Sequence, residues 1–221
     1  GEVAKNSGEG DVLFLCGPGN NGGDGFVAAC SASLAGTRVS VLSSHESSKT
    51  TISSRAREMA AKELPIHVWP ETPEGDWTLI VDCLLGAGGP AEGTELRPPI
   101  IEVTNWATST GLPVISCDIP TGLGGPDSLQ PIRTVTFHSP KMGMSESGCG
   151  EIVVSDLPWP AEVRNCGVGD ANRYPPMDSE ASKGDRGRLL VVGGGPYHGA
   201  PILSGMAAAR SGCDLVHGAM P

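Results

Sequence analysis

Residues 12–25 have the sequence VLFLCGPGNNGGDG, in which an apolar run leads into a loop rich in glycine. Val12–Cys16 is short and wholly apolar, as expected of a buried strand. The alanine-rich stretch Phe26–Leu34 predicts a helix that ends before Gly36. Arg38–Leu42 contains β-branched residues and predicts a second strand. Strand, helix and strand fit within about 30 residues, the size of a βαβ unit.

The same alternation continues along the chain. Apolar residues at helical spacing predict a helix over Thr50–Leu64. Pro98 and Pro99 open another that runs to about Ser109, since proline is tolerated in a first turn. Further strands are expected at Ile66–Trp69, Leu79–Cys83, Pro113–Cys117, Thr134–Phe137 and Ile152–Val154. This alternation predicts an α/β fold, a Rossmann-like three-layer sandwich around a mostly parallel sheet.

Composition divides the chain into a domain at residues 1–157, a linker at 158–182 and a shorter piece at 183–221. The linker is rich in Pro, Asn and Asp and has little periodicity. The last piece carries the pattern of a strand, a helix and a strand, at Arg188–Val192, Ala200–Arg210 and Asp214–His217. One such βαβ piece is too short to bury a core, so we expect the opening of an incomplete second domain. The missing initiator Met and the apolar run before the last residue suggest a chain cut at both ends.

Charge and cysteine usage exclude several functions. The formal net charge is −10, and no basic run suits a nucleic-acid or membrane-surface partner. No stretch approaches the ~18 apolar residues of a membrane span, and no signal peptide is visible. The seven cysteines form no CxxC pair, which suits a reducing compartment, and we expect a cytoplasmic protein.

The glycine-rich loop satisfies the pattern G-x-G-x-x-G from Gly17 to Gly22, between a strand and a helix. Such glycines let the backbone approach a phosphate at the helix N-terminus. The place of the acid that binds ribose in dinucleotide folds holds Ser43 and Ser44 instead, and Glu46 comes slightly late for that role. A merely flexible turn is the alternative, although Asn20, Asn21 and Asp24 make the loop needlessly polar for one.

Two aspartates end later strands of the expected sheet. A carboxylate such as Asp82 is costly to bury without a partner, so we interpret it as a ligand for a hard cation. The glycines that follow it could hold a second phosphate. Asp118 could act as a general acid or base or could bind ribose hydroxyls. The alternatives are a capping aspartate at Asp82 and a turn built by Asp, Pro and Gly at Asp118.

Together these segments resemble the YjeF N-terminal family, the NAD(P)H-hydrate epimerases, over roughly residues 10–155. The resemblance rests on GPGNNGGDG at 17–25, on Asp82 with its glycine loop, on DIPTG at 118–122 and on SPK at 139–141. It implies interconversion of the R and S hydrates of NADH and NADPH, called NADHX and NADPHX, at C6 of the nicotinamide ring.

Carried over position by position, the resemblance implies that Asn21, Asp82 and Thr121 ligate a potassium ion. The ion would help to position phosphate and loop, with Asp82 balancing its charge. Asp118 is the expected acid or base, with Lys141 second. The implied substrate contacts are Asn20, Asn21, Gly22, Gly23, Asp24, Gly86, Ala87, Gly88, Gly89, Pro90, Ala91, Glu92 and Asp118.

The chain departs from the family pattern in three places. Ala87 stands where the family often has a hydroxyl, and Thr121 stands where Ser is common. The family's N-terminal helical segment is essentially missing, which bears on the homodimer that we expect as an assembly.

Residues 183–217 are similar to the start of the ADP/ATP-dependent NAD(P)H-hydrate dehydratase, which has a ribokinase-like fold. The similarity rests on KGD at 183–185, VVGG at 191–194, YHGA at 197–200 and AAARSG at 207–212. Ala200 matches a position that touches substrate in that family. The nucleotide-binding glycine loops of that domain lie farther along, so ADP or ATP is expected only in the complete parent protein.

Two other functions compete with an epimerase. A non-catalytic module on the same fold would bind a nucleotide or a partner without chemistry. An ordinary NAD-dependent dehydrogenase is the poorer alternative, because the chain lacks the ribose acid and no His or Cys suits hydride transfer.

Overall fold

The computed structural model of the chain describes residues 10–88, 95–158, 160 and 180–220. They fall into two compact units that divide after Pro158, and each is described by itself. The first unit holds a seven-stranded sheet with the order β3-β2-β1-β4-β5-β6-β7, in which every neighbouring pair is parallel. Its strands are β1 (Asp11–Cys16), β2 (Val39–Ser43), β3 (Ile66–Val68), β4 (Trp77–Cys83), β5 (Val114–Cys117), β6 (Arg133–Phe137) and β7 (Glu151–Ser155).

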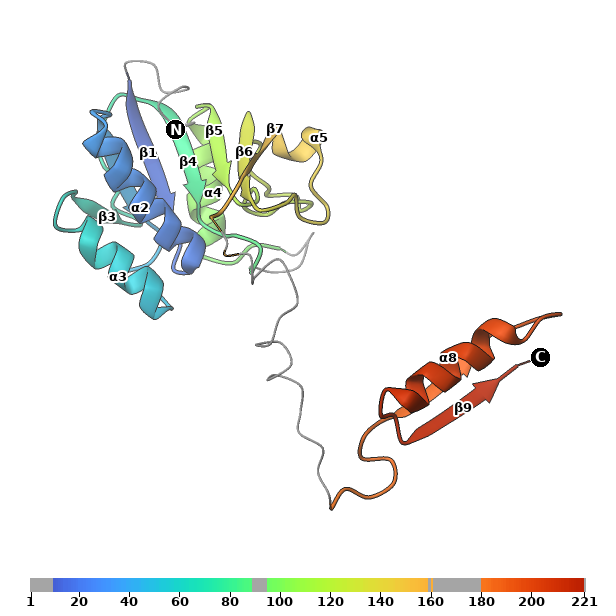
Figure 1. The fold of residues 1–221 in the computed structure, drawn as a ribbon. Helices are drawn as coiled ribbons and strands as arrows, with labels where there is room; N and C mark the ends of the chain where they lie inside the picture. The colour runs from blue at the N-terminus through green and yellow to red at the C-terminus, as the bar shows by residue number, and fades with distance from the viewer. Residues whose placement is uncertain (1–9, 89–94, 159, 161–179, 221) are drawn as a thin grey trace. The chain divides into compact units, whose positions relative to one another are not determined.

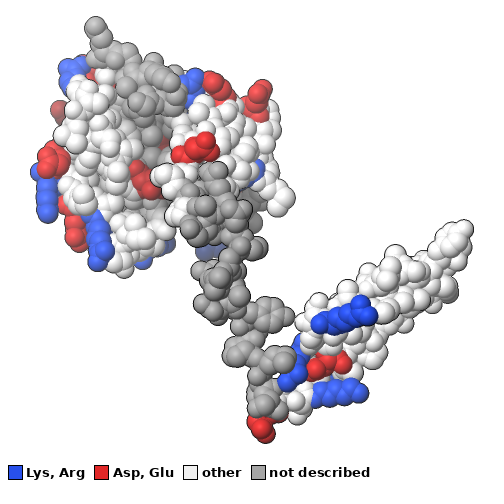
Figure 2. Space-filling model, in the orientation of Figure 1, with Lys and Arg blue, Asp and Glu red and all other residues white. Residues whose placement is uncertain are grey.

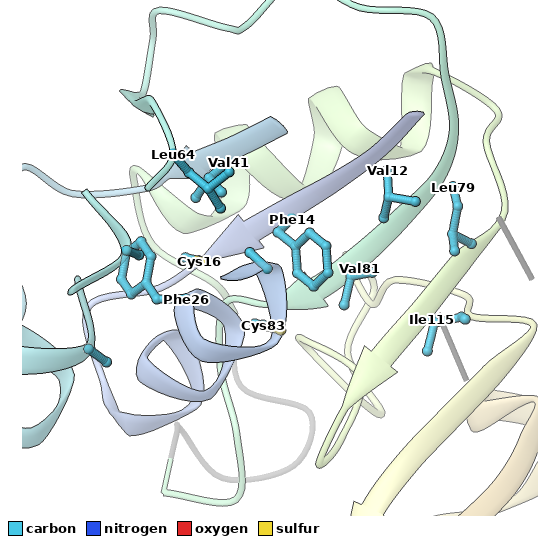
Figure 3. Packing of buried hydrophobic residues seen from close by; sticks show 13 residues of the cluster. Val12, Phe14, Cys16, Phe26, Val41, Leu64, Leu79, Val81, Cys83 and Ile115 are labelled. Atoms are coloured by element: carbon cyan, nitrogen blue, oxygen red, sulfur yellow. The ribbon is translucent and has the colours of Figure 1, made fainter. Parts of the chain in front are cut away.

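Helices cover both faces of this sheet (Figure 1). They are α2 (Asn20–Leu34), α3 (Thr51–Ala60), α4 (Ile100–Ser109) and the short α5 (Glu146–Cys149). On one face, α2 and α3 pack against alternate residues of β1 such as Phe14; Figure 3 shows this cluster around Phe14 and Phe26. On the other face, α4 packs against residues such as Leu13 and Leu15. The predicted three-layer α/β fold is therefore confirmed, and the first sheet is wholly parallel.

The central strands carry apolar residues on both faces because both faces are covered. Val12 through Cys16 have no solvent exposure at all. This double burial explains why an unbroken apolar run, rather than an alternating one, marked β1 in the sequence.

Helix α2 begins six residues earlier than the sequence pattern predicted, at Asn20 instead of Phe26. The glycine-rich loop is therefore largely the first turns of the helix, although glycine disfavours helix interiors. Close packing explains the difference. A Cβ atom on Gly22 would lie 1.8 Å from the carbonyl oxygen of Gly17, so only glycine fits where this turn folds against the end of β1.

The second turn of α2 rests on two thiols. Cys16 and Cys83 end the neighbouring strands β1 and β4 and are opposite each other in register. A Cβ atom on Gly25 would lie 2.9 Å from Cys16 Sγ and 2.6 Å from Cys83 Cβ. Burial raises the pKa of the Cys16 thiol, and a hydrogen bond with the Cys117 thiol, together with burial, raises that of Cys83.

The second unit consists of β8 (Arg188–Val192), α8 (Gly199–Arg210) and β9 (Leu215–Ala219), with the two strands parallel. This is the predicted βαβ piece. Large apolar side chains are exposed on it, among them Val192, Tyr197 and Leu203. Most of the proposed linker at 158–182 lies outside the described residues, so the domain boundaries stay a prediction.

Two surface properties accompany the fold. Figure 2 shows acidic and basic side chains interspersed over the visible face of the first unit. Among the helices that the structure describes, none combines the length and the apolar character needed to cross a bilayer.

Candidate functional site

The candidate site is a cleft at the carboxyl edge of the first sheet. From β1 the chain adds β2 and β3 on one side, and then β4 to β7 on the other, so the order reverses between β1 and β4. Ligands of open α/β sheets bind at such a switch point. A cleft of about 880 Å³ opens there, within the usual size range of small-molecule sites. Its lining comes from the segments that follow β1, β2, β4, β5 and β6.

Asn21, in the first turn of α2, joins three strand ends. Its Nδ2 donates to the carbonyl oxygens of Leu85, at 2.9 Å, and Cys117, at 3.2 Å, which follow β4 and end β5. The side chain lines the cleft, yet the residue is only 8% exposed. Its Oδ1 is buried and has no hydrogen-bond partner among the described residues. A buried polar atom without a partner is rare and calls for an explanation.

Asp82 is the penultimate residue of β4 and is completely buried. Its Oδ1 accepts hydrogen bonds from the Leu84 amide (3.1 Å) and the Thr121 hydroxyl (2.7 Å). Its Oδ2 accepts from the Ser116 hydroxyl and the Thr121 amide, both at 2.9 Å. Burial raises the pKa of this carboxyl above its usual value, and the four hydrogen bonds oppose that rise.

Thr121 completes the cluster. Its Oγ1 donates to Asp82 and accepts from the Leu85 amide at 3.1 Å. Asn21 and Thr121 therefore hold the carbonyl and the amide of one residue, Leu85. The structure thus brings the three residues expected to ligate a cation into one hydrogen-bonded cluster.

The donor set of this cluster fits a potassium ion. Amide, carboxylate and hydroxyl oxygens are the donors that hard cations prefer. The unpartnered Asn21 Oδ1 is available to such an ion without breaking a bond. The Asp82 carboxylate already accepts four hydrogen bonds, which use all its acceptor sites. An ion bound to its Oδ1 would therefore share that oxygen with the Thr121 hydroxyl.

Asp118 follows β5 and adopts a left-handed backbone, with φ of 68°, which is uncommon for a residue other than glycine. Its Oδ1 pairs with Lys141 Nζ at 2.5 Å, and its Oδ2 accepts from the Ala87 amide at 2.9 Å. Lys141 also donates to Thr136 Oγ1 and to the Phe137 carbonyl, both at 2.8 Å. The two residues expected to share the proton chemistry are therefore in direct contact at the β5–β6 side of the cleft.

The other predicted substrate contacts fall into four groups. Asn20, Asp24 and Gly86–Gly88 line the cleft. Partial burial and then the Asp118 charge raise the pKa of Asp24. Gly22 and Gly23 are buried in α2, where they serve packing. The remaining two groups are the segment Gly89, Pro90, Ala91 and Glu92, which lies outside the described residues, and Ala200, which belongs to α8 of the second unit. All of these contacts stay predictions.

Sequence reasoning missed several residues of the cleft. His45 and Lys49 follow β2, Arg97 and Glu95 precede α4, and Phe137 ends β6. Only their position after a strand end or before a helix could have signalled them, and no motif marks those segments. The contact between Asp118 and Lys141 could not be predicted either, since 22 residues of chain lie between the two partners.

Comparison with known proteins places this architecture. A profile described as "YjeF-related protein N-terminus" matches residues 2–143. The chain belongs to the YjeF N-terminal family. The crystal structure of the yeast protein ynu0 shares its fold, with a TM-score of 0.56 and 22% identity over 79% of this chain and 75% of that one.

Two curated relatives of this YjeF N-terminal chain carry the name "Bifunctional NAD(P)H-hydrate repair enzyme Nnr". The protein from Archaeoglobus fulgidus is 36% identical over all of this chain and 48% of its own length. That from Hyperthermus butylicus is 37% identical over 95% of this chain and 42% of its own length. The chain therefore spans about half the length of the curated relatives it matches.

Proposed function

We propose that this chain interconverts the R and S forms of NADHX and NADPHX, with a potassium ion bound beside the substrate. One observation carries the proposal: at the switch point of the sheet, in a cluster with Asp82 and Thr121, the buried Oδ1 of Asn21 has no hydrogen-bond partner among the described residues. Family membership and the relatives named for NAD(P)H-hydrate repair support the same reading.

Asn21, Asp82 and Thr121 would hold the ion. When bound, it supplies a positive charge near the substrate phosphates and orders the loop after β4. The protein itself holds this loop at Leu85, because Asn21 binds the carbonyl of Leu85 and Thr121 binds its amide. Gly86–Gly88 follow directly and line the cleft, so this anchor positions the backbone that would approach the phosphates.

Asp118 and Lys141 would handle the proton. Epimerisation at C6 proceeds if a proton given to the ring hydroxyl lets it leave as water. Return of water to the opposite face, with loss of one proton, reverses the configuration and balances the reaction. Asp118 lines the cleft and would transfer this proton, while Lys141, 2.5 Å away, holds the carboxyl in place.

The direct test starts from one purified epimer of NADPHX. Chromatography then follows appearance of the other epimer, with K⁺ or with tetramethylammonium, against the spontaneous rate. We expect the chain to accelerate the exchange and K⁺ to be required for the full effect. Asp118→Asn should lower the rate by about 100-fold or more. Asp76→Asn is the matched control, because Asp76 is exposed and outside the cleft.

An unchanged rate in Asp118→Asn would overturn the catalytic assignment. Binding of an adenine dinucleotide with no acceleration of either epimer would instead favour the non-catalytic module.

The second unit is best interpreted as the start of the dehydratase domain. Support comes from relatives that are bifunctional and about twice as long as this chain. Dehydration with ADP or ATP is proposed only for a complete parent protein, and location in the cytoplasm and a homodimeric assembly are proposed with it.

A further inference from the structure

The cleft has two chemically different ends. Asp118 and Phe137 lie where β5 and β6 end, whereas His45 and Lys49 follow β2. Between β2 and β5 lie β1 and β4, so three strand spacings of ~4.8 Å separate the two ends by about 14 Å. A dinucleotide whose reacting ring lies at Asp118 can therefore extend its adenosine half toward β2.

The end at β2 offers little to a ribose diol. Ser43 Oγ donates to the His45 carbonyl at 2.7 Å and accepts from Arg57 at 2.9 Å. Ser44 Oγ is bonded to His45 Nδ1 at 2.9 Å. These hydroxyls are thus committed to the protein. The carboxylate that usually receives ribose hydroxyls at this strand end is replaced by Ser43 and Ser44.

Two basic residues, His45 and Lys49, line the cleft at the same end, whereas the acidic Glu46 beside them is exposed and does not line it. Lys49 is exposed at the cleft wall and has no ion pair among the described residues. Behind it, Arg57 donates to the His45 carbonyl at 2.6 Å. Burial lowers the pKa of His45, and the neighbouring charges of Lys49 and Arg57 lower it further. By contrast, Asp24 lies close enough to Asp118 to feel its charge.

We propose that His45 and Lys49 receive the 2′-phosphate of the adenosine ribose, so that this chain prefers NADPHX to NADHX. The inference rests on the proposed epimerase function, whose substrate it makes specific. In doubly wound folds a basic side chain at the end of the second strand accommodates a 2′-phosphate, and an acid there accommodates the free hydroxyl. This chain has the basic arrangement. Arg57 acts as a positioning residue, because it holds the backbone of His45 rather than lining the cleft.

The test compares both substrates in the 221-residue chain. We expect kcat/KM to be higher for NADPHX than for NADHX, and Lys49→Gln to reduce that ratio about tenfold. Lys62→Gln is the matched control, since Lys62 is exposed just beyond α3 and outside the cleft. Calorimetric binding of NADP⁺ and NAD⁺ gives a second readout that needs no activity, and Lys49→Gln should selectively weaken NADP⁺.

The two proposals fail in different ways. If neither hydrate is epimerised, the proposed function is wrong, and the ratio of NADP⁺ to NAD⁺ affinity still decides the 2′-phosphate site. If both hydrates are epimerised equally well and Lys49→Gln changes both alike, the epimerase stands and the 2′-phosphate site is wrong.

Discussion

Asn21 and Thr121 both hydrogen-bond to the backbone of Leu85: Asn21 Nδ2 donates to its carbonyl at 2.9 Å, and Thr121 Oγ1 accepts from its amide at 3.1 Å. Asn21 belongs to α2 and Thr121 follows β5, so their bonds to Leu85 tie the start of a helix and one loop to the loop after β4. The cleft floor therefore depends on polar contacts as well as on the apolar core beneath.

Thr121→Val should destabilise the fold, because it removes the hydroxyl that donates to buried Asp82 and leaves the Leu85 amide without its acceptor. Burying unsatisfied groups of this kind costs about 2–4 kcal/mol in total. Urea unfolding measures the loss. Thr121→Ser keeps the hydroxyl and should recover most of the stability; equal losses in both variants would contradict the assignment.

Potassium should stabilise the chain more strongly as pH rises. The folded-state pKa of Asp82 is raised by burial, so ionising it opposes folding, and stability from the neutral form is lost as pH rises through that pKa. A cation beside the carboxylate offsets this loss only where the group is charged. The measurement is the Tm in K⁺ minus the Tm in tetramethylammonium, from pH 4 to pH 8.

Asp82→Asn supplies the control for the potassium effect, since an amide carries no charge to offset. Its Tm difference should be small and independent of pH. If the Tm difference between K⁺ and tetramethylammonium were as large in Asp82→Asn as in the wild-type chain, the ion would bind elsewhere.

Gly22→Ala should destabilise the fold by about 3 kcal/mol or more, because its Cβ would meet the backbone oxygen of Gly17 at 1.8 Å. Gly19→Ala is a close control within the same motif. No atom lies within 4 Å of a Cβ built there, so only the N-cap preference for glycine over alanine, about 0.5–1 kcal/mol, is at stake. Chemical denaturation measures the free energy of unfolding of both variants. A large loss in Gly22→Ala alone would show that close packing, and not merely a place in the glycine motif, requires glycine.

Asp118→Gly and Asp118→Ala should both lose epimerisation but differ in stability. The left-handed backbone, with φ of 68°, suits glycine and strains alanine. We therefore expect the glycine variant to be more stable than the alanine variant by about 1 kcal/mol. The reverse order in thermal unfolding would mean that the backbone relaxes when the carboxylate is lost.

Lys141→Met should slow epimerisation by roughly 10- to 100-fold, because the Asp118 carboxyl loses the partner that fixes it. Lys141→Arg keeps a cation and should restore part of the rate. A Lys141→Met enzyme with unchanged kcat and KM would show that Asp118 needs no such support.

The elements that sequence predicted best are those whose residue pattern is set by burial. The run at Val12–Cys16 is apolar throughout because both faces of β1 are covered, and that signal is local. The start of α2 was misplaced because its first turns contain three glycines, which have low helix propensity. They are needed there for close packing, as Gly22 is against the Gly17 carbonyl, and propensity does not report packing.

The site was only partly accessible from sequence for a related reason. Asp82 stood out as an acid in an apolar strand, but its joining to Thr121 depends on the neighbouring positions of β4 and β5 in the sheet. His45 and Lys49 carry no motif at all. Their importance comes from the cleft, which exists only once the strand ends are assembled.

The thiols beneath α2 give this protein an internal reporter. Because their surroundings raise the pKa values of both thiols, Cys16 and Cys83 should react slowly with an alkylating reagent while α2 stays packed on them. The rate of modification at these positions would thus report how often the start of α2, which carries Asn21, moves away from the sheet. Substrate or an ion that holds this turn in place would slow the modification, so mass spectrometry could follow ligand binding through two cysteines that do not line the cleft.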